Sequence, residues 1–259
     1  MAETNRNLVY PILQSSNQLM QHGAAPAGEA AMVSWELIGL SSDGQAADLF
    51  TDIAVNYIAS TQMTDGSWPE RWGRPPLEYS AISATAVAIR ALHLYGFPNR
   101  RQEFNDRCSR GAAWLRKARA AGLEESAMRL LGLVWGGASR AAIDKAAQEL
   151  ASAQQPNGGW AQLPTLPADA YATGKALVAL RESGSFGSKS SIFDRGARFL
   201  LGTQESDGSW HVRGRSLPVL ALFESGFPHG RDQVISAAGT SWAVMALTPT
   251  PLYTLLVFR

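Results

Sequence analysis

The stretch QQPNGGW, residues 154–160, decides the fold because its pattern of glutamine, glycine and tryptophan occurs three times in the chain. The other two copies are QMTDGSW, residues 62–68, and QESDGSW, residues 204–210. Their central glycines lie 92 and 50 residues apart along the chain. The larger gap is close to two repeats of about 46 residues. We therefore expect a degenerate unit between the first two copies.

Each copy stands between two helical patterns of different character. The preceding stretches, residues 50–62, 143–154 and 193–204, are half apolar, and in the last of them Phe193, Ala197 and Leu200 share one helix face. The following stretches, residues 80–95, 170–180 and 235–247, are apolar almost all round. Such helices are buried on most sides. We therefore expect outer and inner helices to alternate.

The residues expected at turns and helix ends agree with this pattern. The Asp-Gly or Asn-Gly pair in each copy supplies a residue that tolerates positive φ. Gly96, followed by Phe97 and Pro98, predicts a glycine helix cap with a proline stop, and Gly184 and Gly226 repeat the idea.

These elements predict an all-α fold, an α/α toroid or solenoid of about five helical hairpins. The degenerate hairpin is expected at residues 105–117 and 124–134, and a further pair at residues 8–21 and 31–40. We expect one domain over residues 1–259, with residues 1–28 irregular or forming a partial first hairpin. A β-propeller is disfavoured because the alanine-rich segments do not resemble strands.

Composition narrows the function classes. The net charge of +1 argues against a protein that binds nucleic acid by neutralising phosphates. Charged residues make up 17% of the chain, below the roughly 25% of an average domain, so much of it should be buried or line an apolar cavity. The polar start shows no signal peptide, which predicts a cytoplasmic or peripheral membrane location. The apolar residues 252–258 predict either a membrane-facing patch or packing of a terminal element.

The repeated turn, with a small-residue helix after each copy, resembles the repeats of squalene cyclases and related terpene cyclases, whose fold prenyltransferase β-subunits share. The resemblance covers roughly residues 30–250. It implies a ring of inner helices within a ring of outer ones, around a central apolar cavity that takes an isoprenoid-type molecule. Complete rings have about six hairpins, so this chain is expected to form an incomplete ring or part of a larger toroid.

The resemblance extends to a bacterial subgroup, which shares segments similar to residues 74–78 and 226–230. Members of that subgroup often carry a Cys-x-x-Cys-His haem segment, which this chain lacks, so no haem or other cofactor is expected. The prenyltransferase relatives hold zinc with Asp, Cys and His. Here Cys108 stands on an expected outer helix and the histidines show no ligand spacing, so no metal is expected.

The acid motif of the cyclases is missing where it aligns. The resemblance places Asp-x-Asp-Asp-Thr-Ala on Thr85-Ala86, and Ser83 then falls on an acidic position. A serine cannot protonate an alkene at useful rates, because its pKa is far too high. Ser83 is kept as a substrate-binding candidate.

Asp169 is the nearest substitute, since it aligns with the first acidic position in the next motif-bearing repeat. It is either a cavity carboxylate that acts as an acid or a helix N-cap, a position that Asp favours. Asp232 and His229 pose a similar choice before the last inner helix, between an acid–base pair and an ordinary loop pair.

The remaining candidates would line the cavity. Glu78 and Tyr79 face its mouth or lie in a solvated loop, and arginines such as Arg215 bind an acidic headgroup or are surface charge. Tyr171 and Trp242, on inner helices, are expected to contact substrate and to stabilise positive charge. The three motif tryptophans are assigned to the repeat itself.

Two functions remain open. The first is a squalene-cyclase-like domain that binds an apolar isoprenoid, with the isomerase activity of a cyclase. The second is a non-catalytic helical-repeat domain that binds a lipid or a protein, favoured by the missing acids and the small number of hairpins. A prenyltransferase-like subunit is a weaker third reading. We expect no nucleic-acid partner and allow peripheral membrane contact, and the oligomeric state stays open.

Overall fold

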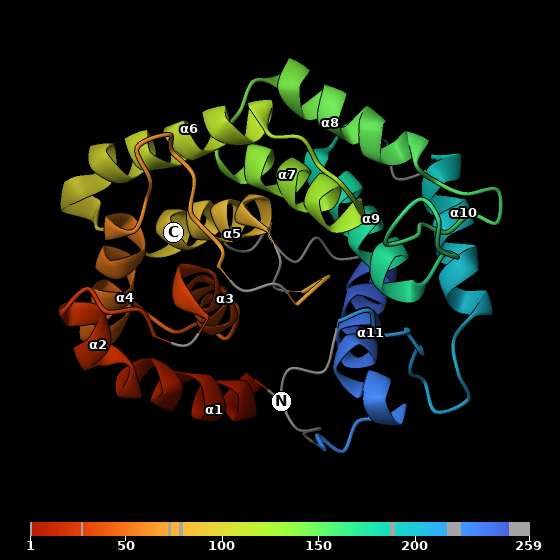
Figure 1. Cartoon of the computed structure of the whole chain (residues 1–259), viewed down its shortest axis with the longest axis horizontal. Helices are drawn as coiled ribbons and strands as arrows, with labels where there is room; N and C mark the ends of the chain where they lie inside the picture. Colours follow the sequence, from red (N-terminus) through yellow and green to blue (C-terminus); the bar gives the residue numbers. More distant parts are fainter. Residues whose placement is uncertain are drawn as a thin grey trace. The chain divides into compact units, whose positions relative to one another are not determined.

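The computed structural model describes residues 2–26, 28–71, 74–77, 80–186, 190–216 and 224–248 (Figure 1). In this part of the chain every regular element is a helix, and an isolated bridge pairs Trp160 with Asp169. The prediction of an all-α fold is therefore confirmed.

The chain divides into two compact units. Unit 1 comprises Met1–Gly73, Glu78–Arg119 and Gly132–Ser139, and unit 2 comprises Arg74–Leu77, Ala120–Leu131 and Arg140–Arg259. We describe each unit by itself, and the single domain expected over residues 1–259 stays a prediction.

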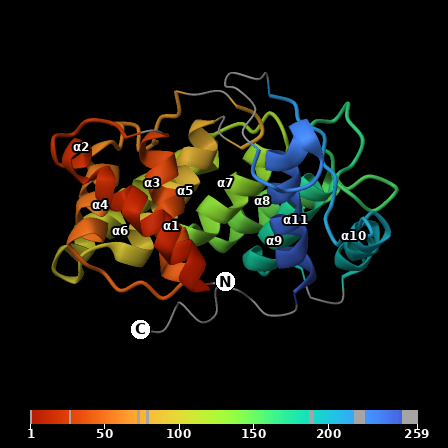
Figure 2. The ribbon, with the colours of Figure 1, turned by 90° about the horizontal axis from the view of Figure 1, so that it is seen from below.

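Unit 1 is built around one largely buried helix, with half-exposed helices packed against it. Its helices are α1 (Ala2–Ser15), α2 (Asn17–Gln21), α3 (Glu29–Ser42), α4 (Leu49–Ser60), α5 (Ala81–Tyr95), the short 3-10 helix η1 (Pro98–Arg100) and α6 (Arg101–Lys117). The central pair is α3 with α5; α4 packs on both, and α6 runs alongside α5 (Figures 1 and 2). The described part of residues 1–28 is largely helical.

Unit 2 centres on α9. Its helices are α8 (Arg140–Ser152), α9 (Ala170–Ser183), α10 (Ser191–Gly202), the short η2 (Gly230–Asp232) and α11 (Gln233–Leu247), together with the first part of α7 (Leu123–Trp135). Helix α9 packs against α8, α10 and α11. A Cβ added at Gly174 would lie 2.5 Å from the carbonyl carbon of Trp242, so glycine lets the backbones of α9 and α11 touch.

The expected difference between inner and outer helices is visible in their burial. Helix α9 buries every residue from Ala170 to Leu180, as the sequence predicts for an inner helix. Helix α10 buries only Gly196 and Leu200, as expected of an amphipathic outer helix. The local pattern of apolar residues therefore predicts the depth of α9 and α10. Helix α11 differs from the prediction, because this expected inner helix buries only six of its 15 residues.

One helix end differs from the prediction. Gly184 and Gly226 have the positive φ expected of a glycine cap, with values of 62° and 78°. Gly96 has a φ of −58° and needs no glycine on conformational grounds. An added Cβ there would lie 2.5 Å from the Leu92 carbonyl oxygen and 3.1 Å from the Phe104 ring. Close packing, rather than backbone conformation, therefore explains Gly96.

The helices were also compared with the length and hydropathy that a membrane span requires. In the described ranges, no helix is both long and apolar enough to cross a membrane.

Candidate functional site

The three repeat turns form the same local structure. In the second turn, Gln154 Nε2 donates to the Gly158 carbonyl at 2.8 Å, and Trp160 Nε1 donates to the Leu150 carbonyl of the outer helix at 2.9 Å. The Trp160 backbone N–H donates to Thr173 Oγ1 of the inner helix, also at 2.9 Å. Equivalent bonds occur between Gln62 and Gly66 (3.0 Å), Trp68 and Ile58 (2.7 Å), Trp68 and Thr85 (2.9 Å), Gln204 and Gly208 (3.0 Å), Trp210 and Leu200 (2.8 Å), and Trp210 and Thr240 (3.0 Å). Each turn thus fastens an outer helix to the inner helix that follows.

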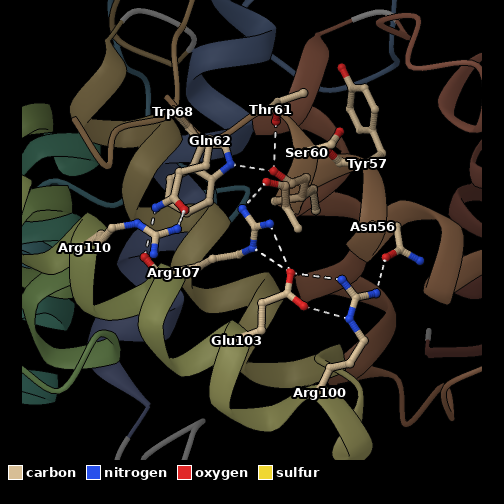
Figure 3. Close-up of polar contacts among 12 residues, drawn as sticks. Asn56, Tyr57, Ser60, Thr61, Gln62, Trp68, Arg100, Glu103, Arg107 and Arg110 are labelled. Atoms are coloured by element: carbon tan, nitrogen blue, oxygen red, sulfur yellow. Dashed lines mark hydrogen bonds and ion pairs between the residues drawn. The ribbon is translucent and has the colours of Figure 1, made fainter. Parts of the chain in front are cut away.

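The first two turns also hold the next outer helix. Gln62 Nε2 donates to the Arg107 carbonyl of α6 at 2.9 Å, and Arg110 Nη2 donates to Gln62 Oε1 at 2.9 Å (Figure 3). In the second turn, Gln154 donates to the Ile192 carbonyl of α10 at 3.0 Å and accepts a bond from Arg195. The glutamine therefore joins three segments of chain.

Arginine contacts reinforce the first turn. Arg107 donates to the Ala59 carbonyl at 2.7 Å and pairs with Glu103, which also pairs with Arg100 (Figure 3). Arg100 in turn reaches Asn56 Oδ1 of α4 at 2.9 Å. These bonds hold α6 against the end of α4.

Asp169 caps the N-terminus of α9. One of its oxygens accepts the Ala172 N–H at 2.8 Å, and the other accepts from Gln162 Nε2 at 2.8 Å. Arg215 Nε donates to the other end of the Gln162 amide at 2.6 Å. Burial raises the pKa of Asp169, while the hydrogen bonds from Ala172 and Gln162 act in the opposite direction. The N-cap alternative is therefore present in the structure, whether or not the carboxyl also acts chemically.

A buried polar cluster lies beside this cap. Lys175 Nζ is 2.6 and 2.7 Å from the two carboxylate oxygens of Glu124, and Tyr171 OH donates to Glu124 Oε2 at 2.6 Å. The exposed fractions of the Lys175 and Glu124 side chains are 3% and 5%. Lys175 Nζ also lies 3.2 Å from Tyr171 OH and 4.8 Å from the ring centroid of Trp242. We call these four residues the Lys175 cluster.

The electrostatics of the Lys175 cluster are balanced internally. Desolvation lowers the pKa of Lys175, and the adjacent Glu124 carboxylate opposes that shift. Burial and the same carboxylate raise the pKa of Tyr171 well above its ordinary value, so the phenol stays protonated and can donate its hydrogen bond. The ammonium lies over the rings of both Tyr171 and Trp242. The ammonium and the carboxylate therefore neutralise each other, and the ammonium covers the faces of these two aromatic rings.

The residues expected before the last inner helix have other partners. Asp232 bonds to His211 Nε2 at 2.8 Å and accepts the Gly214 N–H at 2.8 Å. His229 Nε2 lies 2.8 Å from Ser209 Oγ, and its ring stacks on that of His211 with centroids 4.8 Å apart. Burial would raise the pKa of Asp232, but the bonds from His211 and Gly214 lower it. The carboxylate–histidine pair in this loop is thus formed by His211, which the sequence did not single out.

Three predicted site residues remain, of which the structure describes one. Ser83 is buried in the first turn of α5, in unit 1, and its N–H donates to Ser80 Oγ at 3.3 Å. Glu78 and Tyr79 lie outside the described residues. In unit 2 the structure therefore brings together Asp169, Tyr171 and Trp242.

Sequence reasoning missed both charges of the Lys175 cluster and a half-buried carboxyl on α3. Lys175 did give a signal, since a single charge in an apolar helix requires a buried partner. Glu124 gave none, because it begins the degenerate unit. Burial raises the pKa of Glu36 to about 7.

Two further features bear on ligand binding. A pocket of about 560 Å³ lies in unit 1, lined by residues that include Asp52, Tyr95 and Phe97. Within the described part of the chain, no group of three or more His, Cys, Asp or Glu side chains is placed to hold a metal ion.

Comparison with known proteins adds no family to this description: no family model matches the chain, and no match is found among curated proteins.

Proposed function

We propose that this chain is a non-catalytic helical-repeat domain of the squalene-cyclase-like type, whose role is to bind a partner. The observation that carries the proposal is the closed Lys175 cluster. The groups best suited to chemistry in unit 2 bond to one another: Lys175 to Glu124, and Glu124 to Tyr171. Acid–base work requires a group within hydrogen-bond reach of the substrate, whereas Lys175 and Glu124 are buried and bond to each other.

The aromatic residues point in the same direction. A cyclase uses aromatic faces to stabilise the carbocation of its substrate. Here the ammonium of Lys175 lies 5.3 Å from the Tyr171 ring centroid and 4.8 Å from that of Trp242. The cation that these rings stabilise is therefore part of the protein.

Asp169 is also poorly suited to protonate an alkene. Both of its carboxyl oxygens accept hydrogen bonds, from Ala172 and Gln162. Such bonds favour the ionised carboxylate, whereas an acid catalyst must present a proton to its substrate. Helix capping accounts for the position of this side chain without a catalytic role.

A turnover assay tests the proposal directly. The protein is incubated with squalene and with shorter polyprenyl substrates, and the extracted products are analysed for cyclic hydrocarbons by gas chromatography and mass spectrometry. We expect no cyclic product from the wild type or from Asp169→Asn. Cyclic products from the wild type that disappear in Asp169→Asn would overturn the proposal and assign Asp169 as the acid.

A cyclase-like domain that binds an isoprenoid is the second candidate. It is favoured by the burial that raises the pKa of Asp169, because a carboxyl held protonated is one requirement of alkene protonation. Binding without turnover would appear as an increase in the melting temperature of the protein with increasing polyprenyl concentration. A shift with polyprenyl compounds, absent with a saturated hydrocarbon of equal length, would support this candidate over a protein-binding domain.

A further inference from the structure

Among the described residues, the third turn lacks the cover that the other two receive. Gly66 and Gly158 are buried, whereas Gly208 and the adjoining Gln204 are exposed. A Cβ added at Gly66 or Gly158 would lie 2.6 Å from a carbonyl oxygen of the next outer helix. At Gly208 the nearest atom is Nε2 of Gln204, at 4.0 Å. The glycine that admits a neighbouring helix in two turns has an open surface in the third.

The two helices on either side of this turn are uncovered at matching positions. Leu201 stands three residues before the turn glutamine and is 61% exposed, while the equivalent Ala59 and Ala151 are 3% and 7% exposed. On the inner helix, Val244 stands four residues after the turn-binding threonine and is 51% exposed. Its equivalents, Ile89 and Leu177, are 0% and 3% exposed. Exposed apolar side chains therefore border the third turn on both sides.

The covered turns show what kind of helix fits there. In both, the covering helix carries an Arg-Gly pair, Arg110-Gly111 on α6 and Arg195-Gly196 on α10. The arginine bonds to the turn glutamine through its guanidinium group. The glycine packs on the inner helix, where an added Cβ would lie 2.9 Å from Ile89 Cδ1 or 2.8 Å from Leu177 Cδ2.

The pair goes with the turn and not with outer helices in general. Helix α8 follows the degenerate unit, which has no such turn, and carries Lys145-Ala146 at the same position of the repeat. Helix α4, before the first turn, carries Ile53-Ala54 there. The Arg-Gly pair is thus the complement of a Gln-Gly-Trp turn in this chain.

We propose that Leu201, Gln204, Gly208 and Val244 form a docking surface for an amphipathic helix of another protein that carries an Arg-Gly pair. We call these four residues the third-turn surface. The inference deepens the proposed binding function and rests on it. Charge favours the same partner, because exposed Glu205 and Asp207 stand where the second turn has Gln155 and Asn157. The arginine of the docked helix would bond to Gln204 Oε1, and its glycine would pack on Val244.

A peptide with the α6 sequence, residues 101–117, is a suitable probe because α6 carries the pair that covers the first turn. Isolated helices of this length are marginally stable. The peptide is therefore held helical by a lactam link between positions 102 and 106, and fluorescence anisotropy measures its binding to the full chain. We expect saturable binding that Leu201→Asp or Val244→Asp weakens by about tenfold or more.

Matched controls distinguish specific docking of the peptide from nonspecific hydrophobic binding. Leu49 is 66% exposed and lies in unit 1, so Leu49→Asp should leave peptide binding unchanged. A peptide with Arg110→Ala should bind several-fold more weakly than the parent. Circular dichroism of each protein variant checks that the fold is intact.

No saturable binding, or binding that Leu201→Asp and Val244→Asp leave unchanged, would overturn the docking surface. Self-association in analytical ultracentrifugation that Leu201→Asp abolishes would assign the surface to a second copy instead. Binding to phosphatidylcholine–phosphatidylglycerol vesicles with the same dependence would assign it to a membrane. Squalene turnover together with specific peptide binding would remove the proposed non-catalytic function and leave the docking surface standing.

Discussion

The second and third turns share the same glutamine, glycine and tryptophan but lie in different surroundings. Both bury their tryptophan, with exposed fractions of 0% for Trp160 and 1% for Trp210, and both make the same bonds to the flanking helices. In the part of the chain that the structure describes, only the second of these turns is covered, through Gln154 bonds to Ile192 and Arg195.

The comparison separates two tasks within one motif. The tryptophan and its two bonds fasten an outer helix to an inner one, and they do so whether or not another helix follows. The glutamine and the glycine, in contrast, meet the next helix where one is present. The motif therefore has two parts: the tryptophan joins two helices, and the glutamine and glycine contact a third. In the third copy the tryptophan bonds are formed, and the glutamine and glycine are exposed.

Replacing the tryptophans should cause the largest losses of stability, and the losses should be similar for the two turns. Removing a buried tryptophan ring typically costs about 3–5 kcal/mol. Because both rings are fully buried, we expect Trp160→Ala and Trp210→Ala to lower the free energy of unfolding by similar amounts in urea titrations. A much smaller loss for Trp210→Ala would mean that the contribution of the tryptophan depends on the cover of its turn.

Replacing the glycines should make the turns differ. Gly158 and Gly208 have φ values of 90° and 85°, so alanine at either site is strained by about 1–2 kcal/mol. At Gly158 the new Cβ also overlaps the Arg195 carbonyl, and overpacking of this kind adds about 1–3 kcal/mol. Urea unfolding should therefore show a larger loss for Gly158→Ala than for Gly208→Ala. Equal losses would contradict the difference in cover.

Much of this architecture could be predicted from sequence because it is local. The helix faces, the positive-φ glycines and the cap at Asp169 depend on residues within a few positions of one another. The bonds from the turn glutamines to the carbonyl groups of Arg107 and Ile192 could not be predicted, because every residue has a backbone carbonyl and the sequence does not indicate which one is contacted. They require the helices to be packed first.

The Lys175 cluster shows the same limit for side chains. Glu124 and Lys175 are 51 residues apart, and Glu124 lies in a unit that has lost the repeat motif. A buried lysine demands a partner, but the spacing does not say which carboxylate will meet it. Likewise, Asp232 bonds to His211 rather than to His229, which is nearer in the sequence. The loop places the His211 ring beside the carboxylate.

Replacing the glutamines should give smaller effects in the same direction. Gln154 makes three hydrogen bonds, one of them with the Arg195 guanidinium. A typical hydrogen bond within a protein contributes about 0.5–1.5 kcal/mol. Gln204 is exposed and bonds to Gly208 alone among the described residues. We expect Gln154→Ala to lower the melting temperature measurably and Gln204→Ala to change it little. Equal decreases would indicate that Gln204 also holds a segment in place.

The smallest effect should come from one of the two titratable differences between the turns. Asp207 occupies the position of Asn157, and hydrogen bonds from Ser209 lower its pKa. A lowered pKa in the folded state gives stability that is present above the unfolded pKa of about 4 and is lost as the pH falls through the folded value. Asp207→Asn keeps the acceptor, as Asn157 does for Gly159 at 3.1 Å. We therefore expect the variant to lose slightly less melting temperature than the wild type on acidification from neutral pH, with the two nearly equal at neutral pH. A wild type no more acid-sensitive than Asp207→Asn would show that the third turn gains nothing from the charge of its aspartate.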